Sequence, residues 1–436
     1  MDYQQAVDYL VNRTPMFQNK GAGAYKEGLE NTIALDRHFG SPHRLFDTIH
    51  VAGTNGKGSV SHTLAAVLQA SGLKVGLYTS PHLTDFRERI RINGTPVSQD
   101  FVSRFVSYNL EFFEKLHPSF FEVATAMAFY WFSMEKVDVA VIETGLGGRL
   151  DCTNIITPKL SIITNIGFDH MQFLGDTLDK IAGEKAGIIK RGVPVVIGED
   201  CPITRPVFQA KADAEHAPVI FAQDSDKITS VYRKDISTVT YQTDLLKDLD
   251  SCLAGFCQEK NANTILHAID CLRLQGFEIS DRNIREAFAN VCEMTGLKGR
   301  WQRVSSSPAV ICDTGHNSHG IKYIAKQLKE AIDSPEYDTV RIVMGMVGDK
   351  DIDHVLELMP ENAVYYFTQA SVERAMNVNV FQQKASRFGL IGNAFPTVEQ
   401  AYHAAVADAS DRDLIFVGGS TFIVADMMKM PEFSSL

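Results

Sequence analysis

The sequence lacks an apolar run of the roughly 18 residues that a membrane-spanning helix needs. It also lacks a basic excess: the 436 residues carry a formal net charge of −11, which disfavours nonspecific attraction to nucleic acid or to an acidic membrane. The N-terminus is polar and contains acidic residues, so no signal peptide is predicted. These absences predict a cytoplasmic protein that binds neither nucleic acid nor membranes.

Paired cysteine spacings are absent as well. The seven cysteines are odd in number and scattered, so neither a disulfide framework nor a zinc site is indicated, and we expect reduced thiols. What is present is ordinary for a globular protein, with 45% hydrophobic and 22% charged residues. The length predicts two domains, with three as the alternative.

The order of the predicted elements is typical of an α/β fold. Strand-like runs alternate with helical patterns, which favours a mostly parallel sheet with helices on both faces. The strand-like runs are 46–51, 74–78, 137–142, 160–166 and 194–197. The helical patterns are 59–71, 98–116, 122–136 and 177–190, followed by 261–274 and 281–291. Short β-type runs at 219–222 and 238–241 predict an antiparallel edge or flap.

A glycine-rich turn at residues 50–59, HVAGTNGKGS, joins a strand-like run to a helical one. Its glycines allow backbone N–H groups to converge on a phosphate, the helix N-terminus adds positive potential, and Lys57 supplies a full charge. Ser59 offers a hydroxyl group to a magnesium ion. The spacing departs from the common phosphate loop, because Gly58 separates the lysine from Ser59 and Val51 replaces the first glycine. A turn that binds no phosphate is the alternative.

The βα rhythm restarts after the polar, glycine-containing segment 295–299, which predicts a hinge. Strand-like runs follow at 310–313, 340–344, 363–367 and 414–417, with helical patterns between them. We therefore expect a mostly parallel, P-loop NTPase-like sheet domain over residues 1–296. A smaller, Rossmann-like α/β domain should follow over residues 297–436.

Polar residues follow two of the predicted strands. Glu143 comes after run 137–142 and precedes the glycine-rich turn 144–151; such a carboxylate suits Mg²⁺, although a capping or solvated glutamate is the alternative. His170 follows run 160–166. A lone histidine is more often structural than a ligand, but the ends of separate parallel strands can converge on one site.

Lys185 lies in a helical segment with small, apolar neighbours. Most helical lysines are solvated, and Glu184 offers a partner in a charged patch. If the side chain turned inward, burial would favour the neutral amine. A neutral lysine can react with carbon dioxide to form a carbamate anion, which can bind a metal. The residues alone leave both interpretations open.

Taken together, the motifs resemble those of the folylpolyglutamate synthases, which belong with the ATP-dependent Mur-type amide ligases. Many bacterial members of this family also act as dihydrofolate synthases. The matching residues before position 297 are the run around Lys57, 80–83 (SPHL), 88–90 (ERI), 121–122 (FE), 145–151 (GLGGRLD), 169–170 (DH) and 184–188 (EKAGI). Those after it are 299–300 (GR), 313–317 (DTGHN) and 349–351 (DKD).

The resemblance implies an ATP-binding Mur-ligase-type domain, residues 1–296, hinged to a ligase domain, residues 297–436. It implies an ATP-dependent ligase that adds L-glutamate to the carboxylate of a folate, of dihydropteroate, or of both, through an acyl phosphate. ATP and two Mg²⁺ ions are the implied cofactors, and the enzyme is expected to be a monomer. Closure of the smaller domain over the larger would exclude water from the acyl phosphate.

The resemblance also implies a role for individual residues. The catalytic residues are Lys57, His170 and Lys185. The magnesium ligands are Ser59, Glu143, His170 and, if it is carbamylated, Lys185. The ATP-binding residues are Gly53, Thr54, Asn55, Gly56, Lys57, Gly58, Ser59, Asn261, Arg300, Asp313 and His316. The residues that bind the acceptor substrate are Ser80, Pro81, His82 and Asp151.

Three departures from the family pattern bear more on acceptor preference than on the reaction. Thr144 replaces a usual valine, 314–315 (TG) replaces Gly-Ala, and 421–422 (TF) replaces Leu-Tyr. Two other functions stay open at this point. One is a Mur-type ligase for a different carboxylate acceptor, which competition between acceptors would identify. The other is a nucleotide-dependent switch, which would change conformation without glutamate-dependent turnover.

Overall fold

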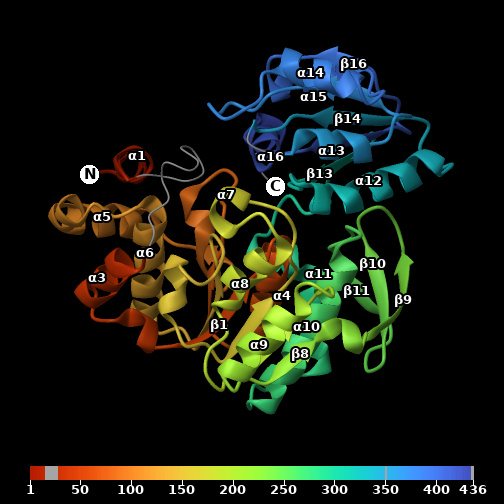
Figure 1. Ribbon diagram of the computed structural model, residues 1–436. Coiled ribbons are helices and arrows are strands. Elements are labelled where there is room, and N and C mark those ends of the chain that lie inside the picture. Colours follow the sequence, from red (N-terminus) through yellow and green to blue (C-terminus); the bar gives the residue numbers. More distant parts are fainter. Residues whose placement is uncertain (15–27, 349–350, 434–436) are drawn as a thin grey trace. The chain divides into compact units, whose positions relative to one another are not determined.

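The computed structural model describes residues 1–14, 28–348 and 351–433 (Figure 1). Asp349 and Lys350 of the DKD motif lie outside this part of the chain. The chain folds into two compact units. The first comprises 1–231, 241–250 and 260–297, and the second comprises 232–240, 251–259 and 298–436. In the part of the chain that is described, no helix is both long enough and apolar enough to cross a membrane.

The sheet of the first unit has eight strands in the order β4-β3-β2-β5-β1-β6-β7-β8. They are β1 (Asp47–Ala52), β2 (Val75–Tyr78), β3 (Ile90–Ile92), β4 (Thr95–Pro96), β5 (Val139–Glu143), β6 (Leu160–Ile163), β7 (Val195–Ile197) and β8 (Val219–Phe221). All pairs from β2 to β8 are parallel, whereas β3 and β4 are antiparallel. The carboxyl ends of β5, β1 and β6 therefore lie side by side at one edge of the sheet.

Helices cover both faces of this sheet (Figure 1). They are α1 (Tyr3–Arg13), α3 (Glu30–His38), α4 (Lys57–Ala70), α5 (Gln99–Leu116), α6 (Phe120–Met134), α7 (Met171–Leu174), α8 (Leu178–Ala186), α9 (Arg205–Ala214), α10 (Gln258–Leu274) and α11 (Asp281–Thr295). On one face, α6 packs on Ala140 and Ile142, and α8 and α9 pack on Ala52 and Ile163. Because strand side chains alternate, Val141 and Glu143 point to the other face, where α4 contacts β1, β2 and β5.

The sheet of the second unit has six strands in the order β12-β13-β17-β14-β15-β16. They are β12 (Gln302–Ser306), β13 (Ala309–Asp313), β14 (Val340–Met344), β15 (Val364–Phe367), β16 (Gly392–Ala394) and β17 (Leu414–Gly418). Only the β12–β13 pair is antiparallel. Helices α12 (Ser318–Asp333), α13 (Ile352–Leu358) and α14 (Val378–Ser386) cover one face. Helices α15 (Val398–Ala407) and α16 (Thr421–Met428) cover the other.

The predicted fold class is confirmed, since both sheets are mostly parallel and carry helices on both faces. Residues 238–241 do belong to an antiparallel sheet, formed by β9 (Ile228–Arg233), β10 (Val239–Thr243) and β11 (Leu249–Ser251). The same prediction for 219–222 was wrong, because β8 pairs with β7 in parallel. Helix α9, which the sequence patterns did not indicate, supplies the crossover that a parallel pair requires.

Candidate active site

The predicted phosphate loop comprises residues 53–59; its first four residues, 53–56, lie between the end of β1 and the start of α4 at Lys57. Gly53 has a φ of 147° and Gly56 a φ of 82°, which are backbone regions that favour glycine. A Cβ atom at Gly56 would lie only 2.3 Å from Oδ1 of Asn261. The turn therefore requires glycine, and the missing side chain lets α10 bring Asn261, the predicted adenine contact, beside the loop.

Two lysines donate hydrogen bonds to one oxygen atom in this loop. The Nζ atoms of Lys57 and Lys185 each lie 3.0 Å from the carbonyl oxygen of Gly53, and Lys57 also donates to the carbonyl of Thr54 at 3.2 Å. Lys185 is only 4% exposed. Burial, and then the charge of Lys57, lower the pKa of Lys185 to about 7. Its amine therefore reaches the neutral form near neutral pH, unlike an ordinary lysine.

The backbone of Lys185 is held by the glycine-rich turn after β5. A Cβ atom at Gly148 would lie 2.8 Å from the carbonyl oxygen of Glu184 and 2.9 Å from that of Lys185. The amide of Arg149 donates to the carbonyl of Glu184 at 2.7 Å, and its guanidinium pairs with the Glu184 carboxylate. The last turn of α8 is thus packed directly on the turn that follows Glu143. Glu184 pairs with Arg149 rather than with its neighbour Lys185.

Glu143 ends β5 and is 3% exposed. The backbone N–H of Ser80 donates to its Oε2 at 3.3 Å, so a predicted metal ligand lies beside a predicted substrate residue. Ser59 lies in the first turn of α4 and is also buried. Among the described residues, no three His, Cys, Asp or Glu side chains lie close enough to hold a metal ion. A magnesium ion here would need hydroxyl, phosphate or water oxygens besides the Glu143 carboxylate.

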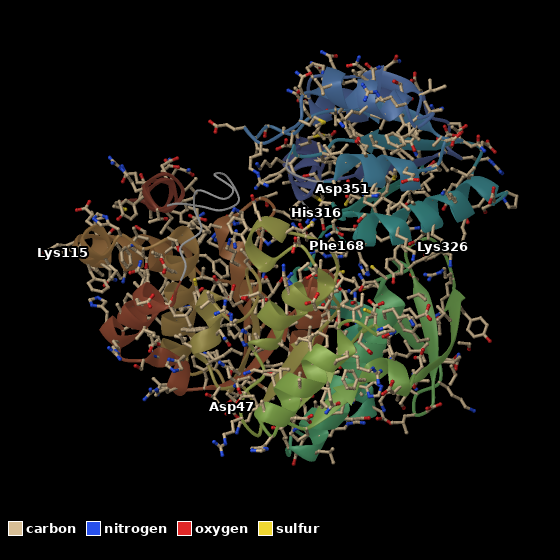
Figure 2. The ribbon with its side chains drawn as sticks, viewed as in Figure 1. Asp47, Lys115, Phe168, His316, Lys326 and Asp351 are labelled. Atoms are coloured by element: carbon tan, nitrogen blue, oxygen red, sulfur yellow. The ribbon has the colours of Figure 1, made fainter. Side chains whose placement is uncertain are left out.

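His170 lies on the loop that follows β6, and it has a left-handed backbone conformation before α7. Its backbone N–H donates to Oδ1 of Asp169 at 2.9 Å, and its ring Nε2 lies 3.8 Å from the same oxygen. The imidazole is 28% exposed, and Phe168, labelled in Figure 2, is 48% exposed. The imidazole is therefore accessible to a ligand at the edge of the sheet where Lys57 also lies.

Asp151, predicted to bind the acceptor, is buried and bound within its own loop. Its Oδ2 accepts from the amide of Leu146 at 2.8 Å, and its Oδ1 accepts from the amide and hydroxyl of Thr153 at 3.0 and 2.5 Å. Burial raises the pKa of this carboxyl. Asp151 therefore braces the turn that follows Glu143, which is a structural function that the sequence patterns did not indicate.

His50 on β1 completes this network from the opposite side. Its Nε2 lies 2.8 Å from the hydroxyl oxygen of Thr153. Burial and the charge of Lys190 lower the pKa of His50 to about 3, so its ring is neutral. Because the Thr153 hydroxyl donates to the Asp151 carboxylate, its oxygen accepts from His50, which carries its proton on Nε2. One hydrogen-bond chain thus links the strand before the phosphate loop to the turn after Glu143.

Among the other predicted acceptor residues, Pro81 is exposed and His82 is half-buried. Nε of Arg89 donates to Nδ1 of His82 at 2.7 Å, so a neutral His82 ring has its proton on Nε2. Arg89 is 3% exposed, and its guanidinium lies 5.0 Å from the centre of the Phe120 ring. Burial lowers the pKa of Arg89 to about 10. The orientation of the His82 ring is therefore set by a buried cation.

The predicted residues of the second unit form their own cluster after β13. Asp313 ends this strand, and its carboxylate accepts from the amides of Trp301 and Gly315, each at 2.7 Å. Burial raises the pKa of Asp313. The guanidinium of Arg300 donates to the Thr314 hydroxyl, and Nδ1 of His316 lies 3.0 Å from the Thr314 carbonyl oxygen. Thr314, a departure from the family pattern, therefore contacts two of the predicted ATP-binding residues, Arg300 and His316.

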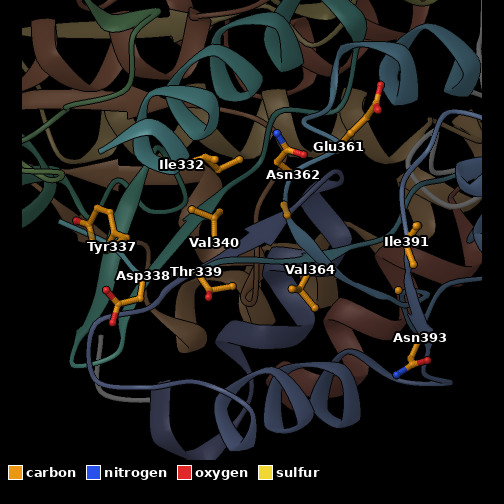
Figure 3. A pocket seen from close by; sticks show the side chains of 12 residues that line it. Ile332, Tyr337, Asp338, Thr339, Val340, Glu361, Asn362, Val364, Ile391 and Asn393 are labelled. Carbon is orange, nitrogen blue, oxygen red and sulfur yellow. The ribbon is translucent and has the colours of Figure 1, made fainter. Parts of the chain in front are cut away.

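A pocket of about 630 Å³ lies elsewhere in the second unit, where β14, β15 and β16 begin (Figure 3). The Asp338 and Glu361 carboxylates line it, and Asp338 pairs with Arg412 at 3.1 Å. It contains none of the predicted site residues. Two carboxylates also disfavour the binding of anionic reactants, so we do not assign the reaction to this pocket.

The structure thus joins Lys57, Lys185 and Asn261 around the phosphate loop, and Ser80 with Glu143. Arg300, Asp313 and His316 lie together in the second unit. Sequence reasoning assigned no role to His50, to Arg89 or to Asn165, which contacts the loop. The signal for Asn165 was a polar pair, 164–165, that interrupts the apolar run 160–166.

Comparison with known proteins gives matches over both units. Residues 51–262 match the Mur ligase middle domain, and residues 299–421 match the Mur ligase glutamate ligase domain. The chain is 32% identical to the dihydrofolate synthase/folylpolyglutamate synthase of Escherichia coli K12 over 432 residues, which cover 98% of this chain and 96% of the relative.

Solved structures agree with this match over nearly the whole chain. E. coli FolC in complex with DHPP and ADP has a TM-score of 0.82 at 30% identity, covering 98% of this chain and 97% of that one. A bifunctional folylpolyglutamate synthase/dihydrofolate synthase with Mn, AMPPNP and L-glutamate bound has a TM-score of 0.78 at 30% identity, with the same coverage.

Substitution of Thr153 by valine tests the hydrogen-bond chain. The valine side chain leaves the His50 N–H without its acceptor and removes one donor from Asp151, so we expect the free energy of unfolding to fall by about 1–3 kcal/mol. Thr153→Ser keeps the hydroxyl and should retain most of the stability. Urea denaturation measures both, and a valine variant as stable as the wild type would contradict the chain.

A titration of Lys185 tests whether Lys57, which donates to the same Gly53 carbonyl, lowers its pKa. Because the charge of Lys57 lowers this pKa from the ordinary value, Lys57→Met should raise it above about 7. Lys115→Met, at a surface position in α5, should leave it unchanged. NMR titration of lysine side chains labelled at Cε measures both; an unchanged pKa in Lys57→Met would show that the two ammonium groups do not interact.

Proposed function

The chain belongs to the dihydrofolate synthase/folylpolyglutamate synthase family of Mur-type ligases, and from that premise we propose that it is an ATP-dependent ligase that adds L-glutamate to a pteroate or folate carboxylate. The family match over 98% of the chain carries this proposal. The lysines around the Gly53 carbonyl support the proposal, because they supply the positive charge that a nucleoside triphosphate requires. We infer that dihydropteroate and reduced folates are both acceptors.

The proposed reaction has two steps. An oxygen of the acceptor carboxylate attacks the γ-phosphorus of ATP, and ADP leaves; the amine of glutamate then attacks the acyl carbon, and phosphate leaves. Lys57 stabilises the charge that spreads over the transferring phosphoryl group. The N–H groups at the N-terminus of α4 hold the phosphates in place. Asp151 keeps the turn after Glu143 in position, and Ser80, Pro81 and His82 contact the acceptor.

Magnesium fits the donor set of the first unit. Ser59 and Glu143 offer the hard oxygen ligands that Mg²⁺ prefers, and they leave positions for phosphate and water oxygens. When bound, two Mg²⁺ ions would neutralise charge on the transferring phosphoryl group. His170 lies on the neighbouring strand end and is exposed enough to reach the same region. We propose these three residues as the protein ligands.

Carbamylation of Lys185 would complete this ligand set. Its neutral amine attacks the carbon of carbon dioxide, an N–C bond forms, and the nitrogen loses a proton, which yields a carbamate anion. The depressed pKa supports this step, because an ordinary lysine is almost entirely protonated at neutral pH. The carbamate would also carry negative charge next to Lys57, where two ammonium groups now share one carbonyl oxygen.

The two domains have separate proposed roles. We propose an ATP-binding domain over residues 1–296 and a ligase domain over residues 297–436, with Asn261 contacting adenine. Arg300, Asp313 and His316 are proposed to contribute to ATP binding from the ligase domain. We propose a cytoplasmic monomer, and its seven free thiols suit a reducing compartment.

Glutamylation assays test the function directly. Purified protein with ATP, Mg²⁺, L-glutamate and either dihydropteroate or tetrahydrofolate should form ADP, phosphate and an amide product identified by mass spectrometry. Lys57→Met should lower the rate by about 10²–10³-fold, since it removes charge stabilisation of the transition state. The surface control Lys115→Met should keep the wild-type rate. Phosphate release without a glutamylated product would contradict the ligase assignment.

The carbamate has a separate test. Carbon-13 NMR of the protein in labelled bicarbonate should show a carbamate carbon, which is absent from Lys185→Arg because arginine stays protonated. Since the amine loses its proton near pH 7, the carbamate signal should increase as the pH rises through that value. A signal of equal strength in Lys185→Arg would assign the carbamate to another amine.

A further inference from the structure

We propose that Asn165 is a positioning residue for the nucleotide, and that Glu199 orients its side chain. This inference rests on the proposed binding of ATP at residues 53–59, and it assigns a role to two residues outside that loop. Asn165 is 4% exposed and lies just beyond the end of β6. Glu199 follows β7, the next strand in the sheet.

Asn165 holds the loop with its backbone carbonyl and with the oxygen of its side-chain amide, while the amide nitrogen contacts Glu199. Its carbonyl oxygen accepts from the amide of Thr54 at 3.0 Å, and its Oδ1 accepts from the amide of Asn55 at 2.9 Å. Its Nδ2 donates to the Glu199 carboxylate at 3.2 Å. Two successive N–H groups at the start of the proposed anion cradle are therefore fixed by a single residue.

The orientation of this amide follows from its partners. The Asn55 N–H can only donate, so it must face Oδ1, and an ionised carboxylate can only accept, so Glu199 must face Nδ2. Rotating the amide by half a turn would bring two donors together on one side and two acceptors together on the other. Glu199 therefore selects the amide orientation that holds Asn55.

Other contacts from the same segment reinforce the loop. The Thr164 hydroxyl donates to the carbonyl of Asn55 at 2.5 Å, and the amide of Gly167 donates to the Thr54 hydroxyl at 2.9 Å. A Cβ atom at Gly53 would lie 1.8 Å from the Thr164 hydroxyl oxygen. The segment 164–167 thus packs along one side of the phosphate loop and supplies hydrogen-bond partners that water would otherwise provide.

This segment continues directly into Asp169 and His170, the proposed metal ligand. Because Asn165 bonds to Thr54 and Asn55 and also lies in the segment that leads to His170, it fixes the position of the phosphate loop relative to the start of the His170 loop. A side chain with this role should affect binding of the nucleotide more than binding of the acceptor, because its contacts with the loop are made to Thr54 and Asn55. A residue that only stabilised the fold would instead affect binding of the nucleotide and of the acceptor alike.

Reversal of the hydrogen bond provides the test. Asn165→Asp places two carboxylates together, so we expect the Kd for ADP and the KM for ATP to rise about tenfold. Adding Glu199→Gln restores one carboxylate and one amide in exchanged positions, since the introduced glutamine amide donates to the carboxylate at position 165 and so reverses the original hydrogen bond. The double variant should bind ADP within about threefold of the wild type. The KM for the acceptor should stay unchanged in both.

Asn263→Asp is the matched control, because this buried asparagine also bridges backbone groups, the amide of Lys227 and the carbonyl of Ala222. It should lower stability without changing the Kd for ADP. If Asn165→Asp does not fold, Glu199→Ala serves instead. It removes the acceptor of the Asn165 amide and should weaken ADP binding about threefold.

Calorimetry with ADP and thermal unfolding report on binding and folding independently of ligation. Wild-type affinity in a folded Asn165→Asp variant, or in Glu199→Ala if that is the variant used, would overturn the inference. A double variant no better than the single one would overturn it too. Failure of the wild type to bind either ADP or ATP would instead contradict the proposed function, so the two failures are distinguishable.

Discussion

The carbonyl oxygen of Gly53 accepts hydrogen bonds from two lysines, and much of the site follows from this crowding. Two ammonium groups so close together in a buried place repel each other, and the more buried one, Lys185, loses affinity for its proton. Lys57 stays at the N-terminus of α4, where an anion is favoured. One carbonyl thus holds two identical side chains whose affinities for a proton differ.

This crowding depends on the order of the strands. β1 lies between β5 and β6, so Lys57, Glu143 and His170 arrive at one edge of the sheet from positions far apart in the chain. α8 then packs on the face of the sheet that carries His50, and its Lys185 reaches the carbonyl of Gly53. The polar residues beneath this edge, His50 and Asn165, do not face solvent. They link neighbouring strand ends, and the predicted site residues next to those ends are positioned through them.

Much of this could be predicted from the sequence, because hydrophobic periodicity and glycine-rich turns are local signals. The runs at 46–51 and 137–142 lie within two residues of β1 and β5, and the turn at 53–59 lies where it was expected. The direction of β8 was mispredicted, because a short apolar run carries no information about its partner. The bond between Asn165 and Glu199, and that between His50 and Thr153, join residues distant in sequence, so no local pattern reveals them. Asp151 differs, since its partners Leu146 and Thr153 are near in sequence and only its burial depends on the rest of the fold.

The ligase assignment is tested most directly by following the oxygen atoms of the acceptor. Dihydropteroate labelled with oxygen-18 in its carboxylate should transfer one labelled oxygen to the inorganic phosphate while its glutamate amide forms. That transfer requires the carboxylate oxygen to have been bonded to phosphorus, as the acyl phosphate demands. Amide formation with unlabelled phosphate would contradict the account, and so would ATP hydrolysis with no amide.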